Sequence, residues 1–120
     1  GVTFHRIMKG FMVQGGHNSE KEANTIKGEF KSNGIENNIS HVRGVISMAR
    51  ISGQPNSASD QFFIVHEDST FLDGEYAAFG KVTSGMEVID KLAEVKVEDD
   101  NGTVLAENQP IIESIKVIEK

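Results

Sequence analysis

The 120-residue chain contains no cysteine and no tryptophan, and its apolar residues do not gather into long runs. Without cysteine it can form neither a disulfide nor a thiolate zinc site, which is compatible with a reducing compartment, and we expect a cytoplasmic location. No apolar run approaches the roughly 20 residues that a helix needs to cross a bilayer, so no membrane partner is expected. The formal net charge is −6 and no basic stripe is present, which argues against nucleic acid as a partner.

The composition that remains is that of an ordinary globular chain, with 38% apolar and 25% charged residues. The length is close to the common size of single domains, about 100–150 residues. We find no internal repeat, low-complexity tract or linker. Residues 1–120 are therefore expected to form one domain with a single core.

Short β-type runs bounded by turn residues dominate the pattern. Strands are predicted at 2–7, 11–14, 44–50, 61–65, 76–82 and 111–119, and the polar, glycine-punctuated segment 17–41 is a long connection. Ser84 and Glu87 match a capping box ahead of apolar residues at helical spacing, which predicts one helix near 84–94. The acidic run 98–100 is predicted to be a solvated loop tip.

The stretch from Phe4 to Gly16 combines a permanent cation, apolar side chains and a carboxamide. In its second strand, period-2 alternation places Met12 and Gln14 on one face and Phe11 on the other. Arg6 reaches the first face from the neighbouring strand. This set of side chains is unusual for a face that serves only the core.

The stretch Phe4-His5-Arg6-Ile7-Met8-Lys9-Gly10-Phe11-Met12-Val13-Gln14-Gly15-Gly16 resembles the signature of the cyclophilin family of peptidyl-prolyl cis-trans isomerases. Further matching blocks follow in the family's order at 44–50, 56–64, 71–74 and 79–82. The resemblance implies a mainly β fold, a cyclophilin-like antiparallel β-barrel that is incomplete at its N-terminus because the first strands and first helix are missing. The loop from 52 to 59 resembles bacterial members more than eukaryotic ones.

The same resemblance implies an isomerase that accelerates rotation about Xaa–Pro bonds in protein folding, with no cofactor and no metal. Amide resonance sets the barrier to this rotation at ~18–20 kcal/mol. A fixed cation near the prolyl nitrogen would stabilise the twisted amide, and Arg6 matches the family's catalytic arginine. Gln14, the second catalytic residue of the resemblance, would hydrogen-bond the substrate carbonyl or brace Arg6.

The resemblance also implies a groove for proline-containing peptides and unfolded proteins. Its apolar slot for the proline ring would be lined by Phe11, Met12, Phe63 and Leu72. Gln61 would lie at the groove edge. The backbone of Ala49 and Arg50 would pair with the residue before proline, with the Arg50 side chain in solvent.

Two groove positions depart from the family pattern. Phe71 stands where many relatives have tryptophan, and the lost indole N–H should weaken binding of cyclosporin, the family's cyclic-peptide inhibitor, more than catalysis. Tyr76 stands where relatives often have histidine, which keeps an aromatic wall but changes its polar tip. His5 resembles the family's motif histidine, which implies a buried, hydrogen-bonded structural residue.

Other interpretations of these residues remain open from the sequence alone. A single Phe or Met is more often ordinary core packing, and Arg6 read by itself is more often a surface arginine paired with a carboxylate. His17, His41 and His66 lack metal-ligand spacing. The serines 47, 57 and 59 lie in no recognisable nucleophile motif, so hydrolysis is not expected.

Two other functions are compatible with the sequence. One is a proline-peptide binding or scaffold module without turnover. The other is an inactive fragment that exchanges strands with a second copy. The open edges of an incomplete barrel would carry unpaired backbone groups, which favour a homodimer or a complementing chain.

Overall fold

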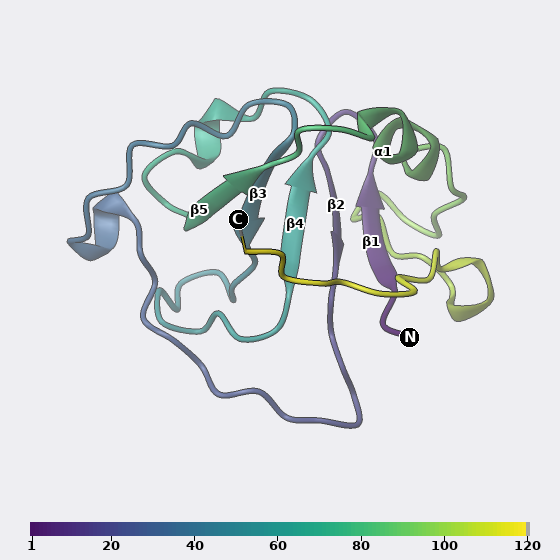
Figure 1. The fold of residues 1–120 in the computed structure, drawn as a ribbon, viewed down its shortest axis with the longest axis horizontal. Coiled ribbons are helices and arrows are strands. Elements are labelled where there is room, and N and C mark those ends of the chain that lie inside the picture. Colours follow the sequence, from purple (N-terminus) through teal and green to yellow (C-terminus); the bar gives the residue numbers. More distant parts are fainter. Residues whose placement is uncertain (120) are drawn as a thin grey trace.

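The computed structural model describes residues 1–119, in which a five-stranded antiparallel sheet is the main element (Figure 1). Its strands are β1 (Phe4–Met8), β2 (Met12–Gly15), β3 (Val45–Met48), β4 (Phe62–Val65) and β5 (Ala78–Lys81). Their order across the sheet is β1-β2-β4-β3-β5. The mainly β, antiparallel prediction is confirmed, and within the described residues the sheet does not close into a barrel.

The predicted helix is present as α1 (Met86–Leu92), and three short 3-10 helices, η1 (Lys31–Asn33), η2 (Thr70–Leu72) and η3 (Ala106–Asn108), lie in the connections. The capping-box prediction is wrong. Gly85 occupies the N-cap in the left-handed conformation, at φ 95°, and no side chain caps the helix. The chain turns sharply into the helix on a glycine, so the Ser84 hydroxyl does not serve as the cap and α1 is shorter than expected.

The two faces of the sheet carry two separate apolar clusters. Val13 of β2 and Ile64 of β4 are register partners, and they belong to one cluster with Ile89 of α1. Met12 and Phe63 belong to the second cluster. Because side chains alternate along a strand, the second cluster lies on the face opposite α1. This leaves that face open for a binding site.

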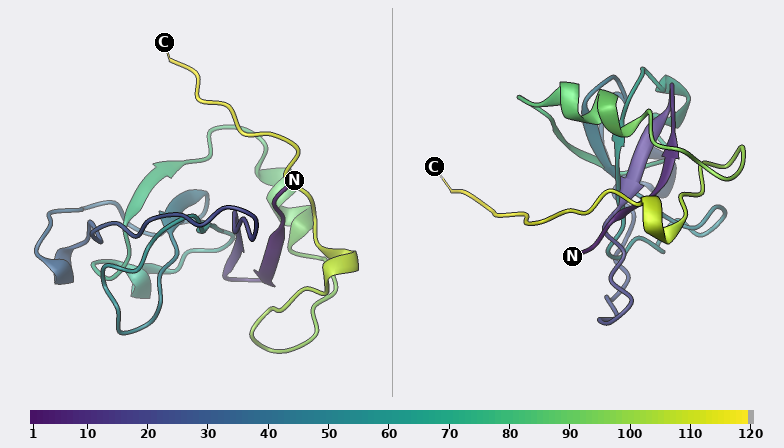
Figure 2. Two further views of the ribbon diagram at one scale, coloured as in Figure 1. Left: turned by 90° about the horizontal axis from the view of Figure 1, so that it is seen from below. Right: turned by 90° about the vertical axis from the view of Figure 1, so that its right-hand side faces the viewer.

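The outer edge of β1 is covered by the chain that follows α1. The Ile7 N–H donates to the Gly102 carbonyl at 2.8 Å, and the Phe4 N–H donates to the Pro110 carbonyl at 3.0 Å. Beyond this point the predicted strand 111–119 is wrong, because an isolated bridge between Thr3 and Ile111 is its only ladder contact within the described residues. The following segment extends away from the body of the protein (Figure 2). A β-type pattern becomes a strand only beside a partner, and none of the described strands lies next to this segment.

No helix among the described residues has the length and apolar character required to span a bilayer.

Candidate active site

A cavity of about 90 Å³ lies on the face that carries the second cluster. The sequence predictions and the cavity share nine residues: Arg6, Phe11, Met12, Gln14, Ala49, Arg50, Phe63, Leu72 and Tyr76. They come from β1, β2 and the turn between them, from β4 and η2, and from the connections beside β3 and β5. Segments far apart in the chain are therefore brought to one hollow by the sheet.

The strand register aligns three of the cavity-lining side chains, and the buried Ser47 behind them, in one row. Arg6 lies opposite Gln14 of β2, and Gln14 lies opposite Phe63 of β4. Phe63 in turn lies opposite Ser47 of β3. Directly opposed residues on neighbouring strands point to the same face, so the row places a cation, a carboxamide and an aromatic ring next to one another.

Arg6 is held by several hydrogen bonds to uncharged groups. Its Nη1 donates to Gln14 Oε1 at 3.2 Å, its Nε donates to the Asn101 carbonyl at 2.8 Å, and its Nη2 donates to Asn101 Oδ1 at 2.9 Å. A longer contact of 3.5 Å joins Nη2 to the Met8 sulfur. Within residues 1–119 no carboxylate forms an ion pair with Arg6. A surface arginine paired with an acid is therefore not what the structure shows.

The Gln14 side chain braces Arg6 and is itself fixed. While its oxygen accepts from Arg6, its Nε2 donates to Gln61 Oε1 at 2.9 Å. An arginine, a glutamine and a second glutamine thus form one chain of side-chain hydrogen bonds along the cavity wall. Such a chain limits the positions that the guanidinium can take.

The prediction that Phe11 lies on the face opposite Met12 is wrong. It lies in the turn before β2, so the period of the strand does not apply to it, and its ring lines the cavity together with Met12. Phe71 does not line the cavity and is 72% exposed. Its ring centre is 5.4 Å from that of Phe11, so Phe71 extends the apolar surface at the rim.

The prediction for the Arg50 side chain is wrong. Its side chain was expected in solvent, whereas only 11% of it is exposed. Its guanidinium lies 4.9 Å from the ring centre of Phe30 and 4.7 Å from that of Tyr76. Phe30 comes from the long connection between β2 and β3, so the stacked arrangement could not be read from the local sequence.

Gln61 does not line this cavity and lies in a neighbouring cavity of about 290 Å³. This second cavity shares Gln14, Ala49 and Arg50 with the first. Its other lining residues are Ile51, Ser57 and Ser59. Neither cavity is lined by a carboxylate, although the chain as a whole is acidic.

A serine, histidine and aspartate network lies behind Phe63, with Ser47 and His41 buried and Asp73 at the surface, and no sequence pattern predicted it. His41 Nε2 is 2.9 Å from Ser47 Oγ, and His41 Nδ1 is 2.9 Å from Asp73 Oδ1. His41 and Ser47 have no exposed surface, so no substrate can reach the hydroxyl. The His41 ring instead stacks on Phe63, with ring centres 6.0 Å apart. The network therefore supports one wall of the cavity.

His5, expected to be buried, is only half-buried, and burial lowers its pKa from the ordinary value of 6.5. The more deeply buried histidines are His41 and His66. His66 Nδ1 accepts the Gly10 N–H at 2.9 Å, and its Nε2 is 3.1 Å from Asp90. The hydrogen bond from Gly10 fixes the turn that leads into Phe11. No group of three His, Cys, Asp or Glu side chains comes together as a metal site among residues 1–119.

This chain is similar to known proteins in both sequence and fold. The family model for cyclophilin-type peptidyl-prolyl cis-trans isomerases matches residues 1–117. Peptidyl-prolyl cis-trans isomerase A of Dickeya dadantii is 43% identical over 126 aligned residues, which cover this whole chain and 66% of that protein. The human peptidyl-prolyl cis-trans isomerase-like 3 is 39% identical, over 82% of this chain and 62% of its own length.

Among solved structures, a Cryptosporidium parvum cyclophilin-type isomerase, crystallised in the presence of the dipeptide Ala-Pro, superposes with a TM-score of 0.79 and 28% identity. The match covers 99% of this chain and 75% of that protein. The chain spans about two thirds of the length of these sequence relatives. By sequence and by fold, the chain belongs to the cyclophilin-type peptidyl-prolyl cis-trans isomerase family.

Proposed function

We propose that this chain accelerates cis-trans rotation about Xaa–Pro bonds and so assists protein folding. The observation that carries the proposal is the Arg6 guanidinium, which has no ion-pair partner among residues 1–119 and is fixed beside a cavity with apolar side chains in its walls. A carboxylate paired with the guanidinium would offset most of its electrostatic effect on a substrate. Here every polar partner of Arg6 is neutral.

The chemistry needs no covalent step. As the Xaa–Pro bond twists, amide resonance is lost and the prolyl nitrogen gains a lone pair. A fixed cation near that nitrogen interacts more strongly with the twisted amide than with either planar form, and only such differential binding lowers the barrier. Each tenfold gain in rate needs about 1.4 kcal/mol of it.

The walls of the cavity suit a proline ring. Met12, Phe63 and Leu72 are buried by the surrounding protein and present apolar groups to the hollow. An apolar slot with a few polar groups at its edge is the usual form of a small-ligand site. The Ala-Pro dipeptide used with the Cryptosporidium relative supports a proline-containing peptide as the ligand here.

Two finer proposals concern partners. Phe71 has no N–H donor and is exposed at the rim, which supports weakened binding of cyclosporin.

The outer edge of β5 has no further strand beside it among the described residues, and Val117 and Ile118 are exposed. These features support association with a second copy or a complementing chain, which light scattering at several concentrations would detect.

The decisive experiment follows cis-to-trans conversion of a short Xaa–Pro peptide and, separately, its binding by NMR titration. We expect acceleration by the unmodified chain and a loss of at least about tenfold in kcat/KM for Arg6→Ala, with part of the peptide binding retained. Binding without acceleration would assign the groove to a binding or scaffold module. Equal rates for the chain and Arg6→Ala would remove Arg6 from the mechanism.

A further inference from the structure

The acidic loop that the sequence predicts to be a free tip is attached to β1. The Val104 N–H donates to the His5 carbonyl at 3.0 Å, and the Ile7 N–H donates to Gly102 at 2.8 Å. Between these two bonds, Thr103 forms a bridge with Arg6. Residues 98–103, here called the Arg6 loop, thus lie beside the strand that carries Arg6.

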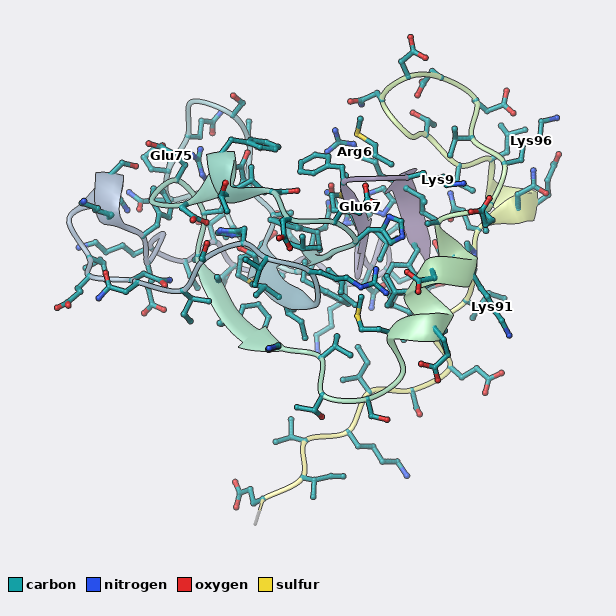
Figure 3. All side chains as sticks on the ribbon, turned by 90° about the horizontal axis from the view of Figure 1, so that it is seen from above. Arg6, Lys9, Glu67, Glu75, Lys91 and Lys96 are labelled. Atoms are coloured by element: carbon teal, nitrogen blue, oxygen red, sulfur yellow. The ribbon has the colours of Figure 1, made fainter. Side chains whose placement is uncertain are left out.

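The Arg6 loop accepts two of the N–H donors of the guanidinium, and Met8 and Gln14 take two more. An arginine side chain has five N–H donors. The Nε donor goes to the Asn101 carbonyl, one Nη2 donor goes to Asn101 Oδ1 and the other faces the Met8 sulfur. One Nη1 donor goes to Gln14, so a single Nη1 donor has no partner within residues 1–119. Since Arg6 lines the cavity, that donor is the one available to a bound peptide. In Figure 3 Arg6 lies at the side of the molecule where this loop projects.

The Arg6 loop is built to present Asn101. The Asp99 carboxylate accepts the N–H groups of Asn101 at 3.1 Å and Thr103 at 3.0 Å, which closes a tight turn. Gly102 has φ +83°, and a Cβ there would lie 2.5 Å from the Ile7 carbonyl oxygen. A glycine is therefore needed for the loop to approach β1 closely enough for Asn101 to reach Arg6.

We propose that Asn101 is a positioning residue that fixes the Arg6 guanidinium while leaving its charge unpaired. The inference rests on the proposed function of Arg6. An amide and a carbonyl hold the guanidinium through dipoles, whereas an aspartate at the same place would hold it as an ion pair. Asp99 and Asp100 precede Asn101, yet neither forms an ion pair with Arg6. The loop therefore directs an uncharged oxygen, and not a carboxylate, at the cation.

The test compares Asn101→Asp with a variant in which the charge is exchanged, Asn101→Asp with Asp100→Asn. Asn101→Asp keeps an acceptor of the same shape and adds a charge. The exchange variant keeps the total charge of the chain and moves only the position of one carboxylate. We expect both to lower kcat by about tenfold while the Kd for the peptide changes by less than about twofold. Asp100→Asn alone is the matched control and should keep the full rate, because the Asp100 side chain forms no hydrogen bond or ion pair with Arg6.

Asn101→Ala tests whether the Asn101 side chain holds the Arg6 guanidinium in place, without adding a charge beside it. It removes the Oδ1 acceptor but keeps the carbonyl that accepts from Nε, so we expect a smaller loss of rate and a more mobile guanidinium. NMR relaxation of the Arg6 Nε–Hε group measures this mobility without any reference to activity, and thermal unfolding of each variant verifies that it is folded. Unchanged mobility in Asn101→Ala would overturn the positioning role. Full activity of folded Asn101→Asp would overturn the requirement for a neutral partner.

The proposed function can fail separately. If the unmodified chain accelerates no Xaa–Pro rotation while Asn101→Ala mobilises Arg6, the catalytic proposal is wrong and Asn101 still positions the arginine. If the chain is active and depends on Arg6 but tolerates Asn101→Asp, only the inference on Asn101 is wrong.

Discussion

The Nη1 of Arg6 donates to Oε1 of Gln14, its register partner across β1 and β2, at 3.2 Å. The two residues are eight positions apart in the chain, on either side of a tight turn. The hydrogen bond therefore requires this strand register. A slip of one residue would send one of the two side chains to the opposite face of the sheet.

Gln14→Glu should convert this brace into an ion pair. The carboxylate would accept from the guanidinium more strongly than the amide does, but it would neutralise the charge that the twisted amide requires. It would also lose the donor that now holds Gln61. We expect kcat/KM to fall by about tenfold or more at neutral pH, measured by peptide isomerisation. A rate equal to that of the unmodified chain would show that an unpaired cation is not needed.

Phe63→Ala should be costly for stability as well as for function. The side chain is 5% exposed and packs against His41 and Tyr76. Truncation of a buried phenylalanine typically costs about 3–5 kcal/mol in the free energy of unfolding. Urea denaturation should show a loss of this size. Phe71→Ala, at the exposed rim, is the comparison, and a surface change of this kind stays within about 0.5 kcal/mol. Similar losses for both variants would contradict the assigned burial.

Arg50→Lys should destabilise the wall between the two cavities. A lysine keeps the positive charge but cannot stack as a plane between Phe30 and Tyr76, nor reproduce the Nε bond to the Glu75 carbonyl. We expect a loss of about 1 kcal/mol in unfolding free energy, measured by urea denaturation. Lys96→Arg, at an exposed position, serves as the control for the chemical change. A neutral result for Arg50→Lys would mean that the stacked geometry contributes little.

Acidification should weaken the fold in two stages, of which the first depends on His5. Burial lowers the pKa of His5 below its ordinary value of 6.5 in the folded chain. The unfolded chain therefore binds the proton more readily, so stability is complete above pH 6.5 and declines as the pH falls through the folded pKa. His5→Gln should remove this first stage in thermal unfolding followed from neutral pH to about pH 5. An identical decline in the variant would assign it to other groups.

The second stage belongs to the aspartates. Hydrogen bonds from Thr103 and Asn101 lower the pKa of Asp99, and Arg43 lowers that of Asp90. For such groups the contribution to stability is present above the ordinary carboxyl pKa and is lost at lower pH. It should thus be visible only below about pH 4, well separated from the His5 stage.

Much of the cavity lining could be predicted because it comes from short, local blocks. Phe11, Met12 and Gln14 lie within one turn and strand, and their spacing matches a family signature that is read directly from the sequence. The location of Phe63 and Leu72 followed in the same way from later blocks. Prediction was weaker wherever a side chain takes its partner from a distant segment, as Arg50 does with Phe30 and Tyr76.

The residues whose roles could not be predicted from the sequence were missed for one physical reason. His41, Ser47 and Asp73 become a network only when β3 and the turn after η2 pack together, and no local pattern marks them. Asn101 stands in a run that reads as a solvated tip, since charge patterning carries no information on which strand a loop will adjoin. In the opposite direction, the apolar alternation in 111–119 suggested a strand, yet the described structure provides no neighbour for it.

By itself the sequence determined the chemical inventory of this protein: a permanent cation, apolar rings and a carboxamide within a family motif, an antiparallel β fold and no cysteine chemistry. The tertiary structure alone decided which groups meet the cation. Strand register set Gln14 opposite Arg6, and the close approach of Gly102 to β1 brought Asn101 to the guanidinium. Hydrogen bonds act over about 3 Å, so their partners are chosen by packing between distant segments and not by composition.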